Sequence, residues 1–195
     1  DAGRVSVLGG FVSPYAFTGI ATRVNSSIAT AANGGTIQIN SGSLEVLNGG
    51  QISSKITIGS GRGGDININS SSVLVSGAKS DGGASAIISG SSGTSTTGSG
   101  GNINLTAGSV RVEDGGYLSS ATTGTGNAGD ISVNATDRIA LRRGAIEASA
   151  SGGGNGGNIA LSAPAIQLAD SSRVAASSNS SGRSGDILVE ADSLV

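Results

Sequence analysis

The 195-residue chain contains no cysteine, histidine, methionine or tryptophan, and aromatic residues make up only 2% of it. Without thiols or imidazoles it cannot form disulfides, the commonest zinc sites, or Ser-His-Asp and Cys-His catalytic groups. A formal net charge of −2, with 12% charged residues, provides no basic surface for nucleic acid. No apolar run approaches the roughly 18 residues of a membrane span. We therefore predict no nucleic-acid partner, no metal, no cofactor and no catalytic residue.

Glycine and serine are abundant, at 35 residues each, which alone would suggest disorder. However, 36% of the residues are apolar, and the sequence repeats itself. A small pair, one further residue and an apolar-x-apolar triplet recur with starts at Gly34, Gly63, Gly100, Ala128, Gly156 and Ser184. The successive intervals are 29, 37, 28, 28 and 28 residues, and a weaker copy starts at Ala2. Such a fixed period is typical of repeat architectures.

Within each repeat the apolar residues alternate with polar ones, which is the pattern of a β-strand. Three such pairs per repeat, divided by Gly/Ser/Asn/Asp turns, predict an all-β, right-handed parallel β-helix. We expect three short strands per coil of about 28 residues, and about six to seven coils. The core would consist of stacked columns, represented by Ile103, Ile131 and Ile159 and by Val110, Ile139 and Ile166. An antiparallel sandwich or barrel is the alternative fold, but it does not require a fixed 28-residue period.

The position before the first strand of each coil holds a polar residue that would form a ladder through Asp65, Asn102, Asp130, Asn158 and Asp186. Asn separates every pair of Asp residues, so like charges are not neighbours. We interpret these residues as Asx turns that satisfy backbone N–H groups. The alternative, a calcium site, lacks the Gly-Gly-x-Gly-x-Asp repeat that such sites use.

Two segments depart from the period. The coil starting at Gly63 is nine residues longer than its neighbours (37 − 28), and the surplus lies within residues 76–99. Because departures in solenoids usually form surface loops, we expect a mobile bulge or a ligand-contacting loop that includes Lys79, Asp81, Ile87 and Ile88. Residues 1–33 form an irregular first coil before the regular repeats of residues 34–195. Its aromatic residues Phe11, Tyr15 and Phe17 would pack in the coil or contact a partner.

Charged residues after the second strand form a predicted surface ladder of Asp114, Arg143 and Asp170 in consecutive coils. An arginine between two acids disfavours register slips. A catalytic interpretation would pair Asp114 with Asp170, as glycoside hydrolysis requires two carboxylates. Arg143 between them would keep both acids ionised and leave no proton donor. The outward positions of the first strand show no aromatic platform for a sugar.

The strings Gly126-Asn127-Ala128-Gly129-Asp130-Ile131-Ser132-Val133 and Gly42-Ser43-Leu44-Glu45-Val46 resemble the repeats of haemagglutinin-type exoproteins of two-partner secretion systems, especially the Ser/Gly-rich cyanobacterial kind. The resemblance covers nearly all of residues 34–195, and the Asn-Pro-Asn type motifs of the family's secretion domain do not occur. It implies a secreted, extracellular protein at the bacterial cell surface, exported through an outer-membrane secretion pore and folding outside as a filamentous haemagglutinin-like fibre.

Two functions follow as hypotheses. The first is a non-enzymatic structural and adhesive shaft that contacts a cell-surface or glycan receptor. The second is a polysaccharide-binding or polysaccharide-cleaving β-helix. Because the sequence shows no polar cap at either end, and uncapped β-helices expose strand edges, we expect more chain at both ends or self-association end to end. The start at Asp1, in repeat-like sequence without a signal segment, is typical of a mature or excised fragment.

Overall fold

The structure is a computed structural model that describes residues 2–9, 19–25, 32–79, 82–93 and 96–195. These residues form fifteen strands, and no helix among them is long and apolar enough to cross a membrane. The strands are β1 (Ala2–Leu8), β2 (Gly19–Asn25), β3 (Ile37–Leu47), β4 (Gln51–Ile58), β5 (Ile66–Ser76), β6 (Ala86–Ser91), β7 (Ile103–Glu113), β8 (Tyr117–Ser119), β9 (Ile131–Arg142), β10 (Ala145–Glu147), β11 (Ile159–Ser162), β12 (Ala165–Ala169), β13 (Arg173–Ala175), β14 (Ile187–Glu190) and β15 (Ser193–Leu194).

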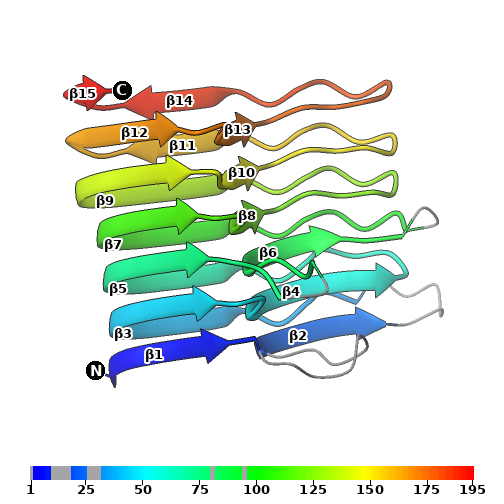
Figure 1. Ribbon diagram of the computed structural model, residues 1–195. Coiled ribbons are helices and arrows are strands. Elements are labelled where there is room, and N and C mark those ends of the chain that lie inside the picture. The colour runs from blue at the N-terminus through cyan, green and yellow to red at the C-terminus, as the bar shows by residue number, and fades with distance from the viewer. Residues whose placement is uncertain (1, 10–18, 26–31, 80–81, 94–95) are drawn as a thin grey trace.

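The strands form two parallel sheets that wind together as a β-solenoid of about six turns (Figure 1). The larger sheet runs in the order β1-β3-β5-β7-β9-β11-β14, with β12 and β15 beside it, and the smaller sheet runs β13-β10-β8-β6-β4-β2. Ile131 pairs with Ile103 on one side and with Ile159 on the other, 28 residues away in each direction. The parallel β-helix predicted from the repeat is therefore confirmed, while right-handed winding stays a prediction from crossover preferences.

The coils differ from the expectation of three short strands. In β3, β5 and β7 one strand of 11 residues carries both the first and the second apolar pair. Pairing continues across the corner between the two pairs, where small residues such as Gly42 and Gly108 lie. Pro164, which has no backbone N–H to donate, separates β11 from β12 in the next-to-last coil.

The interior is filled by the predicted columns. Ile103, Ile131 and Ile159 are exposed by no more than 1%, and Val110, Ile139 and Ile166 by no more than 2%. A third column, from the smaller sheet, contains Ile52, Ile87, Leu118 and Ile146, all of them fully buried. Burying one such side chain contributes about 1.5–3 kcal/mol. Each coil gains this energy only against its neighbours, which explains why the pattern must repeat.

The glycine at the second position of the small pair before the first strand permits the coils to approach closely. A Cβ placed on Gly129 would lie 2.1 Å from the carbonyl oxygen of Gly101, and one on Gly157 would lie 2.0 Å from that of Gly129. No side chain fits at such distances, so the second small residue of each pair has to be glycine in these coils. The recurrence of glycine at this position of the repeat therefore follows from the close packing of adjacent coils.

The first coil begins at a different point from the one that the weak copy at Ala2 indicates. Val5 pairs with Leu44 and Val7 with Val46, so β1 is the second strand segment of its coil and not the first. The alignment was wrong because both segments show the same apolar-x-apolar alternation. β2 pairs with β4 and is the third segment. Residues Phe11, Tyr15 and Phe17 lie outside the described residues.

Candidate functional site

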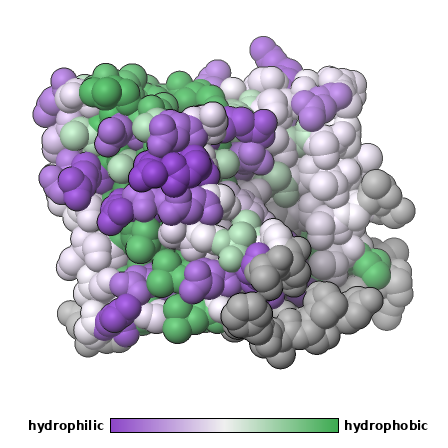
Figure 2. All heavy atoms as spheres, viewed as in Figure 1, coloured by the Kyte–Doolittle hydropathy of each residue, from purple (hydrophilic) through white to green (hydrophobic). Residues whose placement is uncertain are grey.

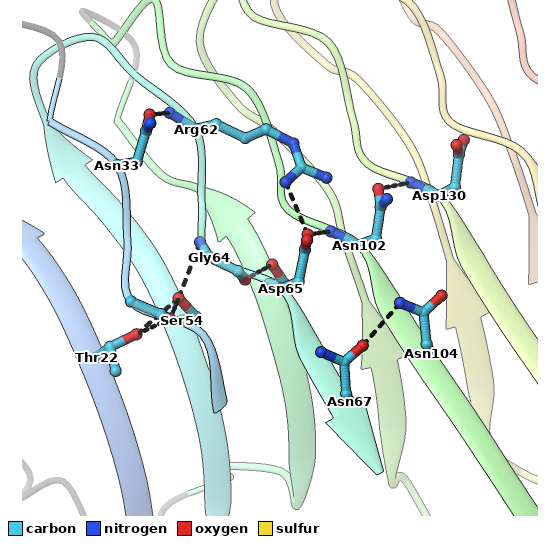
Figure 3. Close-up of polar contacts among 12 residues, drawn as sticks. Thr22, Asn33, Ser54, Arg62, Gly64, Asp65, Asn67, Asn102, Asn104 and Asp130 are labelled. Atoms are coloured by element: carbon cyan, nitrogen blue, oxygen red, sulfur yellow. Dashed lines mark hydrogen bonds and ion pairs between the residues drawn. The ribbon is translucent and has the colours of Figure 1, made fainter. Parts of the chain in front are cut away.

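The predicted turn ladder is present, but its hydrogen bonds join different coils (Figure 3). The backbone N–H of Asn102 donates to Asp65 Oδ1 at 2.8 Å, and that of Asp130 donates to Asn102 Oδ1 at 3.0 Å. The same bond continues from Asn158 to Asp130 at 2.7 Å and from Asp186 to Asn158 at 2.9 Å. The side chains therefore satisfy backbone N–H groups, as predicted, but they do not do so as Asx turns, because the first four residues of the ladder accept from the equivalent residue of the next coil. The ladder has a structural role.

A second ladder of the same kind lies three residues earlier and was missed by the sequence analysis. The backbone N–H of Asn155 donates to Asn127 Oδ1, and that of Arg183 donates to Asn155 Oδ1, both at 2.8 Å. The 28-residue spacing of Asn127 and Asn155 was the signal that could have revealed it. Among the described residues no group of three or more Asp or Glu side chains could hold a metal ion.

The structure brings the predicted charge ladder together at a turn. Asp114, Arg143 and Asp170 all have a left-handed backbone, with φ of 51°, 52° and 52°. Arg143 bonds to Asp114 through Nη2 and to Asp170 through Nη1, the latter at 3.2 Å. Arg142 Nε donates to the same Asp170 carboxylate at 2.9 Å. Figure 2 shows the hydrophilic side chains gathered over β7, β9 and β12.

This ladder is a poor candidate for acid–base chemistry. General acid catalysis needs one carboxyl group that holds a proton while its partner is ionised. Here the Arg143 guanidinium forms ion pairs with both carboxylates and lies between them. The bonds of the turn ladder and the charge ladder form only when equivalent residues of adjacent coils are aligned, so both ladders favour this register. Their contribution to stability is small, since an exposed ion pair adds about 0–1 kcal/mol.

A hollow of about 410 Å³ adjoins the charge ladder on the outside of the smaller sheet. It is lined by Tyr117, Arg143, Glu147 and Arg173, together with the glycine turns between the second and third strand segments. Arg173 Nη2 donates to Glu147 Oε1 at 2.5 Å. Burial, and secondarily the negative charge of Glu147, raise the pKa of the Tyr117 phenol. An aromatic ring and both signs of charge therefore converge on one concave surface.

Tyr117 is absent from the predicted site residues, because the first strand of each coil was the expected place for an aromatic platform. The residue lies in β8, where it pairs with Ala86 and Ala145. Glu147 is also absent from the predicted site residues, and the register gives it Ser119 and Ala175 as neighbours in its own column. Its ion partner Arg173 comes from the adjacent column, which a one-column comparison cannot find.

The expected contact loop is partly wrong. Ile87 and Ile88 belong to β6, and they are exposed by only 0% and 5%. Ile66 pairs with Ile103 at an interval of 37, whereas Ile87 pairs with Leu118 at an interval of 31, so six surplus residues (37 − 31) precede β6 and three (31 − 28) follow it. The Lys79 N–H donates to the Gly83 carbonyl oxygen at 2.8 Å in the first of these insertions. Asp81 lies outside the described residues.

A second, larger groove of about 510 Å³ follows the corner of the larger sheet. Asn40, Asn69, Thr106, Gly42 and Gly108 are among its lining residues. The described residues that line it include no aromatic and no charged side chain, so this groove serves as a control for the hollow beside Tyr117.

Comparison with protein-family models, with curated proteins and with solved structures found no match. The fold therefore defines the class of the protein, a parallel β-solenoid, and its described residues form two hydrogen-bonded turn ladders and a charged, aromatic-containing hollow.

Proposed function

We propose that the chain is a non-enzymatic structural and adhesive shaft of a secreted bacterial cell-surface fibre. One observation carries the proposal: neighbouring coils are joined without interruption from β3 to β14 by parallel strand pairing. Polar side chains at the turns reinforce the same contacts between coils. An array of this kind gains stability from each added neighbour and grows in one dimension, which suits a fibre.

The secretion route is part of the proposal and rests on the resemblance of the repeats to haemagglutinin-like exoproteins of two-partner secretion. The chain has no cysteine, so no disulfide can form before passage through an outer-membrane pore. Each coil also buries its apolar face only against adjacent coils, which allows folding to proceed along the chain as it emerges.

Continuation of the stack past β14, as part of a longer fibre or by another copy of the chain, extends the same proposal. Ile187, Val189 and Leu194 continue the core columns, but they are 46%, 37% and 59% exposed because no described strand covers β14 and β15. Figure 2 shows hydrophobic residues at this end of the stack. Such an edge pairs readily with another strand. Sedimentation of the chain should show assemblies that Val189→Lys abolishes, and a monomer at every concentration would remove this part of the proposal.

The alternative function is a polysaccharide-binding or polysaccharide-cleaving β-helix, and the hollow lined by Tyr117, Glu147 and Arg173 favours its binding form. A reducing-end assay on a panel of polysaccharides separates the cleaving form from the shaft. We expect no release of reducing ends, together with adhesion of the purified chain to intact bacterial or host cells. Reproducible turnover that disappears in Asp114→Asn or Asp170→Asn would overturn the proposal.

A further inference from the structure

The hollow on the smaller sheet is built by residues at matched positions in three consecutive coils. Tyr117, Ala145 and Arg173 occupy one column, because β8 pairs with β10 and β10 with β13 in the same register. Tyr117 and Arg173 are thus two coils apart, roughly 9.6 Å at the usual strand spacing. The small Ala145 lies between them and leaves the space open.

The polar groups around this space supply both donors and acceptors. Arg173 uses one of its nitrogens for Glu147, and a guanidinium carries five N–H donors. Glu147 accepts that bond through Oε1, and within the described part of the structure no bond to its Oε2 is formed. The Ser171 hydroxyl also lines the hollow. A ligand whose groups donate and accept at once, as hydroxyl groups do, can use all of them.

The charged side chains that line the hollow are already paired. Arg173 forms an ion pair with Glu147 within the lining, and Arg143 pairs with Asp114 and Asp170 beside it. A charged ligand would be attracted by one set and repelled by the other, and it would have to displace an existing ion pair. A neutral ligand meets no such cost.

From these features we infer that the hollow beside Tyr117 binds one ring of a neutral glycan, with the sugar face against the phenol ring and its hydroxyls bonded to Glu147 and Arg173. The inference rests on the proposed adhesive function and names the chemistry of its receptor. Aromatic rings provide apolar contact area with a polar edge, which suits the mixed surface of a pyranose. The volume of about 410 Å³ lies within the range of small-ligand sites, roughly 300–1,000 Å³.

The test uses the whole chain and an array of neutral hexose oligosaccharides, with uronate-containing oligosaccharides of the same length beside them. The wild-type chain should bind neutral probes, and Tyr117→Ala should weaken that binding about tenfold or more. Tyr117→Phe should keep most of the affinity, because the ring remains. Thr106→Ala, in the other groove, should bind as the wild type does, and thermal melts should show that every variant is folded.

Three results would overturn the inference: no binding of neutral probes, equal binding by Tyr117→Ala and the wild type, or a preference for uronates. None of them affects the shaft itself, since fibre assembly and the absence of reducing-end release are measured separately. Conversely, catalytic turnover would overturn the shaft while leaving the sugar affinity of the hollow intact.

Discussion

Asp130 accepts a hydrogen bond of 2.7 Å from the backbone N–H of Asn158, the residue at the same turn one coil later. Because Asn158 then accepts from Asp186, each coil fixes the register of the next one outside the strands themselves. The bond needs only a side-chain oxygen, which Asp and Asn both supply. Their alternation therefore answers a second requirement, namely that carboxylates one coil apart should not face each other.

Asn102→Asp tests that requirement. The substituted side chain still offers an oxygen to the Asp130 N–H, but it stands between the carboxylates of Asp65 and Asp130. We expect a loss of about 0.2–1 kcal/mol for each like-charge contact, measured by thermal or urea unfolding at pH 7. At 1 M salt, where charges are screened within about 3 Å, most of the loss should disappear. Asp130→Asn is the control and should be at least as stable as the wild type. A loss that salt does not reduce would point to geometry instead of charge.

The fold could be predicted from the sequence because the apolar pattern that produces it recurs in every coil. Ile103, Ile131 and Ile159 alternate with polar residues at one period, and a stack of parallel strands is the structure that buries such positions together. Alternation also separates inward from outward side chains. The central columns and the charge ladder of Asp114, Arg143 and Asp170 follow from these two facts.

The remaining features depend on information that a period does not contain. From the sequence, Ile87 falls within the segment that was predicted to be inserted. The pairing of Ile87 with Ile52 and Leu118 shows instead that the third strand of the coil begins there, after six surplus residues. The contact between Glu147 and Arg173 crosses columns. Likewise, the partner of Asn102 is a backbone group of the following coil. The alternation of apolar and polar residues predicts on which face of the sheet a side chain lies, but it does not predict which neighbouring residue that side chain contacts.

Ile131→Asp and Ser132→Asp test the inward and outward assignment at adjacent positions. Ile131 is 1% exposed, whereas Ser132 is half-buried on the outer surface. The first variant places an unpaired charge inside a column, whose cost exceeds the whole contribution of the isoleucine, so we expect an unfolded or insoluble chain. The second should change the free energy of unfolding by about 0.5 kcal/mol or less. Circular dichroism and urea unfolding measure both, and similar behaviour of the two variants would contradict the assignment.

Gly129→Ala tests the close approach of the coils. The added Cβ would lie 2.1 Å from the Gly101 carbonyl oxygen, so the backbone has to move and the strand pairing next to it must distort. Gly153→Ala is the matched control in the same coil. The Cβ added at residue 153 would lie 3.7 Å from its nearest neighbour, the Thr125 side chain, which is an ordinary van der Waals distance. We expect a large drop in melting temperature for the first and a small change for the second. Equal melting temperatures of the two variants would show that glycine is not sterically required at position 129.

Lys55 provides a test that depends on pH. Its side chain is half-buried in β4 beside Arg23 of β2, and burial, followed by the charge of Arg23, lowers its pKa from 10.5. Between the lowered value and 10.5 the unfolded chain binds a proton that the native chain has released, so the free energy of unfolding rises with pH there. Below that window the folded protein carries the full cost of a charged ammonium group.

Lys55→Met keeps the length of the stem and removes this cost. We expect a higher melting temperature than that of the wild type at pH 7. The difference should shrink as the pH rises towards and past 10.5, because the lysine then becomes neutral in the unfolded chain as well. Other groups that titrate at high pH, Tyr117 among them, are present in both proteins and cancel in the comparison. Arg23→Met removes only the secondary cause and should give a smaller gain at pH 7. A lower melting temperature for Lys55→Met at pH 7 would mean that the ammonium group has a favourable partner, and it would contradict the sign derived from burial.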